Sequence, residues 1–128
     1  MLLVIALGGA IGALGRYGLS QAVPHARDGF PWSTLLINVS GCLLIGILMV
    51  YVVEVGAVSR YVRPFLGIGV LGGYTTFSTY ALDGHDLLTY RSGASAAAYV
   101  FGTLVGALIA VALGVALRRV LFRSRGAR

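Results

Sequence analysis

The sequence predicts an all-α membrane protein with four transmembrane helices in one domain, and three observations support this. Of the 128 residues, 58% are hydrophobic and only 11% are charged. A soluble domain carries about 25% charged residues, so most of this surface does not face water. Four apolar stretches, at about 2–23, 32–53, 61–82 and 94–117, each approach the roughly 20 residues that span a bilayer. The length is that of a single domain, residues 1–128.

The first stretch is expected to be a retained helix rather than a signal peptide. No basic segment precedes it, and Arg16 lies inside it, where the apolar core of a signal peptide carries no charge. A turn-rich loop, "PHARDGFPW", follows, with Pro24 and Pro31 as breakers. The second stretch begins at Trp32, an aromatic residue suited to a membrane interface.

The third stretch contains "GGYTTFSTY" (Gly72–Tyr80), which is rich in hydroxyls and poor in aliphatic side chains. Its glycines allow close helix contact and allow the helix to open just before Tyr74, so a broken third helix is expected. Unwound backbone at membrane depth must be satisfied by protein or by a bound ion, and carbonyls of broken helices are good sodium ligands. The formal match of "GIGVLG" to a dinucleotide fingerprint is rejected, because no strand precedes it.

The fourth stretch ends in a short basic tail. All ten basic residues are arginines, and five are in the tail: Arg118, Arg119, Arg123, Arg125 and Arg128. A basic run after a transmembrane helix marks the cytoplasmic side, and contact with anionic lipid explains it without a nucleic-acid partner. Four helices put both termini on one side of the membrane, so the arginine bias predicts that both termini are cytoplasmic.

Glycines occur at the small-xxx-small spacing that allows helices to approach closely. The pairs are Gly8/Gly12, Gly69/Gly73 and Gly102/Gly106. Together they predict a tightly packed bundle. Four short helices do not easily enclose a polar path, so we expect a homo-oligomer.

Each predicted span also carries polar groups at helical spacing: Arg16 and Ser20, Thr34 and Asn38, Tyr99 and Thr103, and the third-span segment. Each group has a structural explanation as well. Hydroxyls bond to their own helix backbone, Arg16 could anchor to carbonyls or headgroups, and Asn38 could join helices. Polar stripes on all four helices favour a conduit.

The residue inventory limits what such a conduit could carry. We expect Glu54 and Asp83 at helix ends, so no acid is expected deep in a span, as a proton-coupled cation exporter requires. The groups in mid-span are donors, which favour a small anion. His25 and His85 are expected in loops, at the surface, with no metal-ligand partner at useful spacing, and the single Cys42 forms no internal disulfide. Nothing in the spans indicates an enzyme.

Three motifs resemble those of the Fluc (CrcB) family of fluoride channels: "GGAIGALGRY" (8–17), "PWSTLLINVSG" (31–41) and "GVLGGYTTFSTY" (69–80). The resemblance covers all four helices in order. It implies a bacterial plasma-membrane protein that passively exports fluoride and so protects the cell. It also implies an antiparallel, dual-topology homodimer with two pores and a structural sodium ion.

The resemblance also implies residue roles. Phe77 and Tyr80 match the two pore aromatics, whose electropositive ring edges face the ion. Arg16 matches a vestibule arginine, and Gly72 and Thr75 would lend backbone carbonyls to sodium. The remaining polar side chains of the fluoride path would be Asn38, Thr34, Ser78, Thr79, Asp83, Tyr99 and Thr103.

The sequence departs from the family pattern in three places. Tyr80 replaces a usual phenylalanine, Ala107 is apolar where a serine is common, and Asp83 is shorter than the usual glutamate. The arginine bias also conflicts with dual topology, so pairing with an oppositely oriented homologue is the alternative to a homodimer. Two alternative functions remain: a proton-coupled exporter of small cations or drugs, and a non-transporting assembly subunit.

Overall fold

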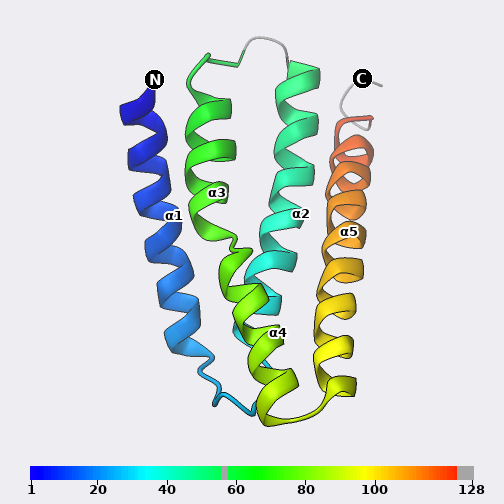
Figure 1. Ribbon diagram of the computed structural model, residues 1–128. Coiled ribbons are helices and arrows are strands. Elements are labelled where there is room, and N and C mark those ends of the chain that lie inside the picture. The colour runs from blue at the N-terminus through cyan, green and yellow to red at the C-terminus, as the bar shows by residue number, and fades with distance from the viewer. Residues whose placement is uncertain (56–57, 124–128) are drawn as a thin grey trace.

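The computed structural model describes residues 1–55 and 58–123, which pass four times along one axis (Figure 1). Three of the passes are the uninterrupted helices α1 (Leu2–Ala22), α2 (Trp32–Val55) and α5 (Gly93–Arg123). Each of these is long and apolar enough to cross a membrane. The N-terminus and the end of α5 lie at the same end of the bundle, as expected for an even number of passes.

The third pass is interrupted, as predicted. It consists of the π-helical segment η1 (Arg63–Leu71), the single turn α3 (Gly72–Tyr74) and the helix α4 (Ser78–Tyr90). The break covers Thr75–Phe77, about halfway along the bundle (Figure 1), and Thr75 is extended with ψ of 157°. It therefore follows Tyr74, whereas we predicted that the helix would open before it.

The prediction that the third span ends in a loop after residue 82 is wrong, because α4 continues through Asp83 and His85 to Tyr90. Hydropathy falls along this stretch, but the helix does not end there. Asp83, Gly84 and Leu87 share the buried face of α4, where α4 packs on α5 around the buried Tyr99. Glu54 does lie in the last turn of α2, and its side chain is exposed.

Glycine contacts hold α1 against the third pass, which confirms two of the predicted pairs. A Cβ atom on Gly8 would lie 2.5 Å from the carbonyl oxygen of Phe65, and one on Gly69 would lie 2.8 Å from that of Ile5. A Cβ on Gly12 would overlap the Val70 carbonyl. The backbones meet because no side chain separates them.

The helices α2 and α5 meet at a glycine pair that the sequence spacing did not indicate. A Cβ on Gly46 would lie 3.2 Å from the Cα of Gly114, and each would also overlap a carbonyl of the facing helix. The predicted pair Gly102/Gly106 does not act in this way. Nothing lies within 4 Å of a Cβ on Gly102, and Gly106 meets only the Val39 side chain, at 3.3 Å.

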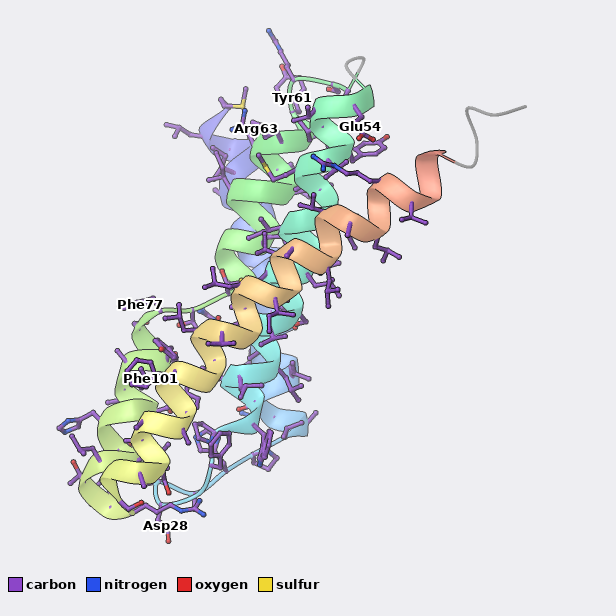
Figure 2. All side chains as sticks on the ribbon, turned by 90° about the vertical axis from the view of Figure 1, so that its right-hand side faces the viewer. Asp28, Glu54, Tyr61, Arg63, Phe77 and Phe101 are labelled. Atoms are coloured by element: carbon purple, nitrogen blue, oxygen red, sulfur yellow. The ribbon has the colours of Figure 1, made fainter. Side chains whose placement is uncertain are left out.

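Large aliphatic side chains radiate from the bundle (Figure 2). Leu2 is 85% exposed and Leu14 is 70% exposed, whereas few side chains, such as Ile37 and Leu87, are fully buried. Aliphatic side chains on the outside of the bundle, with few inside, are expected where the surrounding solvent is lipid. Arg118, Arg119 and Arg123 of the predicted tail fall within α5, while Arg125 and Arg128 lie outside the described residues.

Candidate functional site

The side-chain amide of Asn38 holds the break in the third pass. Its Nδ2 donates to the Thr76 carbonyl oxygen at 2.9 Å, and its Oδ1 accepts from the Thr76 backbone N–H at 2.9 Å. Both backbone groups of Thr76 are thus satisfied by α2 at a point where a helix cannot satisfy them. The proposed interhelical role of Asn38 is therefore observed.

This arrangement leaves carbonyls at the end of α3 without helical partners. In an uninterrupted α-helix the Gly72 carbonyl would accept from the N–H of residue 76, but that N–H is bonded to Asn38. Within residues 1–55 and 58–123, the Thr75 carbonyl accepts a single long contact, of 3.5 Å, from Arg16 Nη1.

A cavity of about 240 Å³ opens beside the break. Its lining joins polar groups of the break to aromatic and aliphatic side chains: Asn38, Thr75, Thr76, Phe77, Tyr80, Thr103, Leu104 and Ala107. Thr103 is buried, and its hydroxyl has no hydrogen-bond partner in the described structure. A buried unpaired hydroxyl is costly unless a ligand or water satisfies it.

The two predicted pore aromatics adjoin each other at this cavity. Their ring centroids are 5.7 Å apart. Phe77 is 79% exposed within the protomer, whereas the Tyr80 hydroxyl donates to the Val100 carbonyl at 2.7 Å. The tyrosine hydroxyl is therefore engaged with α5, which leaves its ring edge for the cavity.

A second cavity, of about 230 Å³, lies on the other side of Thr76. It is lined by residues from three passes: Ala13, Arg16, Tyr17, Ser20, Thr34, Ile37, Thr76 and Thr79. Arg16 therefore shares a cavity with Thr34 and Thr79. Thr76 contributes to both cavities.

Asp83 is buried within α4, which corrects its expected place at a helix end. It accepts a hydrogen bond from Thr34 Oγ1 at 2.5 Å, and its Oδ1 is 3.6 Å from His25 Nε2. The buried Tyr99 hydroxyl lies next to this pair without a hydrogen bond of good geometry. His25 lies in a loop, as expected, whereas the expected loop position of His85 is wrong, because His85 is part of α4.

Not every predicted residue enters a cavity. Ser78 and Gly72 line neither one and are exposed within the protomer. Sequence reasoning missed Thr76, whose hydroxyl accepts from the Thr79 backbone N–H at 3.2 Å, and Tyr74, whose hydroxyl lies 2.9 Å from Ser40 Oγ. Both lie in the polar segment 72–80, so the segment was found although these roles were not. No three His, Cys, Asp or Glu side chains of the described residues form a metal cluster.

The fold and the site define a multi-pass membrane protein with a broken helix and donor-lined cavities at mid-depth. The profile of the family described as CrcB-like protein, camphor resistance (CrcB), matches residues 3–115, and the chain belongs to this family. The fluoride-specific ion channel FluC 2 of Nocardia farcinica is 46% identical over 119 residues, 93% of this chain and 85% of the relative. The fluoride-specific ion channel FluC of Paracoccus denitrificans is 42% identical, over 94% of this chain and 95% of the relative.

Proposed function

We propose that this chain is a fluoride-selective channel in the bacterial plasma membrane, which passively exports cytoplasmic fluoride and so protects the cell. The relatives named above are fluoride-specific channels that match over most of both chains. The structural observation behind the proposal is the buried Thr103 hydroxyl without a partner in a cavity at the helix break. A small anion that sheds water requires replacement donors of this kind.

The proposed path enters through the cavity of Arg16, whose charge attracts anions. Thr34 and Thr79 line this cavity, and Thr76 separates it from the aromatic cavity. The amide of Asn38 carries two hydrogens, of which the Thr76 carbonyl takes one, so one N–H remains for an ion. The protein acts here as a channel and not as an enzyme.

In the aromatic cavity, the ring edges of Phe77 and Tyr80 would face the ion with their positive charge. Thr103 and Tyr99 would supply hydroxyls along α5, and Ser78 would extend the path on α4. Asp83 would lie at the Arg16 end of the path, where it accepts from Thr34. Ala107 lines the cavity without a polar group, so the donors on α5 end at Thr103.

We also propose the antiparallel homodimer. Phe77, Ser78 and Thr79 are exposed within the protomer at membrane depth, and the Ser78 and Thr79 hydroxyls contact the Thr76 hydroxyl. Polar side chains at this depth usually face protein or a water-filled path. A second protomer would cover them and complete the path. Labelling of cysteines introduced at the termini tests this arrangement, because access from both membrane faces is expected for opposed protomers. Access from one face only would favour pairing with an oppositely oriented homologue.

A sodium ion at the dimer interface is the third part of the proposal. Sodium prefers carbonyl oxygens of broken helices, and the Gly72 and Thr75 carbonyls at the end of α3 fit this preference. The bound ion would supply positive charge that neutralises the open end of the helix.

The cation-exporter alternative has little structural support. Such an exporter requires an acid that is free to exchange protons with its substrate. The buried carboxylate of Asp83 instead accepts from Thr34 and faces His25.

Fluoride efflux from proteoliposomes, followed with a fluoride electrode and compared with chloride efflux, tests the function. We expect fluoride efflux alone; equal chloride efflux, or none of either, refutes the proposal. Phe77→Ile should reduce the rate by roughly fivefold or more, the equivalent of one ring-edge contact of ~1 kcal/mol. Phe101→Ile is the matched control, because Phe101 is also exposed, at 65%, but lines neither cavity (Figure 2).

A further inference from the structure

The loop between α1 and α2 places a histidine directly over the buried acid of α4. His25 is in this loop, yet its side chain is only 25% exposed, and Nε2 lies 3.6 Å from Asp83 Oδ1. Its Nδ1 is 3.5 Å from the hydroxyl of the buried Ser33. The ring thus lies between Asp83 of α4 and Ser33 of α2, at 3.6 and 3.5 Å from their oxygens.

Asp83 is in turn connected to the proposed ion path. Its Oδ2 accepts from Thr34 Oγ1, and Thr34 lines the cavity of Arg16. An ionised carboxylate one side chain away from this cavity opposes the entry of an anion. The opposition is strong because the acid is buried, where charges are poorly screened.

The other ionisable groups around the pair do not replace His25 as a cation. From α5, Tyr99 faces the carboxylate, and Tyr80 of α4 adjoins Tyr99. On the loop itself Arg27 and Asp28 are exposed, and Asp86 is half-buried one turn further along α4. Of these, Arg27 alone is a cation, and it lies in solvent.

We propose that His25 is the charge-compensating residue of the fluoride path: its protonated ring neutralises Asp83, and fluoride passage increases when the ring is protonated. This inference rests on the proposed channel function and adds a residue and a pH dependence to it. Histidine is the side chain that ordinarily changes charge between about pH 5 and 8. Flux should therefore fall as the pH on the His25 side rises through this range.

The experiment is fluoride efflux from proteoliposomes at a series of pH values, corrected for leak from protein-free liposomes. We expect wild-type flux to rise roughly tenfold between about pH 8 and about pH 5.5, as one compensated charge near the path predicts. His25→Gln retains an N–H that can donate to Asp83 but carries no charge, so its flux should remain at the high-pH level throughout. His25→Lys should give high flux at every pH, and Asp83→Asn should abolish the pH dependence.

His85→Gln is the matched control, because His85 is exposed on the same helix as Asp83 and should leave the wild-type profile unchanged. If wild-type flux does not depend on pH, the inference is overturned while the channel function stands. This part of the test requires no variant. A wild-type slope in His25→Gln also overturns it, since a group other than His25 would then cause the pH dependence. Absence of fluoride efflux at every pH refutes the channel function itself, and the inference with it.

Discussion

Replacement of Gly12 by alanine should separate α1 from the third pass, whereas the same change at Gly18 should not. A Cβ on Gly12 would lie 2.8 Å from the Tyr74 backbone nitrogen and still closer to the Val70 carbonyl oxygen. These are backbone atoms, so they cannot rotate out of the way. Gly18 is on the same helix, and nothing lies within 4 Å of its Cβ position.

The two substitutions differ only in what the added methyl group meets. Alanine gains about 1 kcal/mol of helix propensity over glycine at either position, so this gain cancels in the comparison. Overpacking costs about 1–3 kcal/mol, and separation of the helices at Gly12 would also loosen the neighbouring Gly8–Gly69 contact. We expect Gly12→Ala to be less stable than Gly18→Ala by at least about 2 kcal/mol.

The measurement is reversible unfolding by SDS in mixed micelles, followed by fluorescence of Trp32, the single tryptophan. Trp32 starts α2 and packs on Phe30 with ring centroids 4.6 Å apart, so its emission reports on the fold away from Gly12. Equal unfolding free energies for the two variants would show that the close backbone approach of α1 and the third pass is not present in the membrane protein.

Three further results are expected. Thr103→Val should lower fluoride flux without lowering stability, because the hydroxyl that it removes is buried and unpaired; a loss of stability in the same unfolding assay would show that the hydroxyl has a partner. Tyr80→Phe should keep wild-type flux within about twofold, since the hydroxyl is bonded to Val100 rather than aimed at the cavity; a large loss of flux would assign that hydroxyl to the path. Replacement of sodium by N-methylglucamine should destabilise the purified dimer on heating if the carbonyls of Gly72 and Thr75 bind the ion, and an unchanged melting profile would argue against that site.

Hydropathy and glycine spacing predicted much of this architecture because both are local properties of the chain. The three uninterrupted helices begin and end within a few residues of the expected positions, apart from the extension of α5 into the basic tail. The third pass was predicted less well, because α4 is amphipathic and its polar residues are of the types that are common in loops. Burial of Asp83 depends on Thr34 and His25, which are 49 and 58 residues away in the chain.

In the candidate site, too, the local features were predicted and the contacts between distant residues were not. The hydroxyls of the segment 72–80 indicated the depth of the site, since polar groups in a span are rare. The partner of each group could not be predicted, because hydrogen bonds between helices depend on their rotation about their own axes. Tyr80 is the clearest case: the sequence showed a hydroxyl in place of the usual phenylalanine, and in the structure this hydroxyl donates to Val100 of α5.

One side chain connects the two ion sites of the proposed channel. The Asn38 amide binds Thr76 on both its backbone groups, and in doing so it removes the N–H that would otherwise satisfy the Gly72 carbonyl. The same pair of hydrogen bonds therefore holds Thr76, which lines both cavities, and leaves the Gly72 carbonyl for the proposed sodium ion. Because the break is the common cause, a variant such as Asn38→Leu should weaken fluoride flux and sodium-dependent stability together. Loss of one property alone would mean that the path and the cation site are built independently.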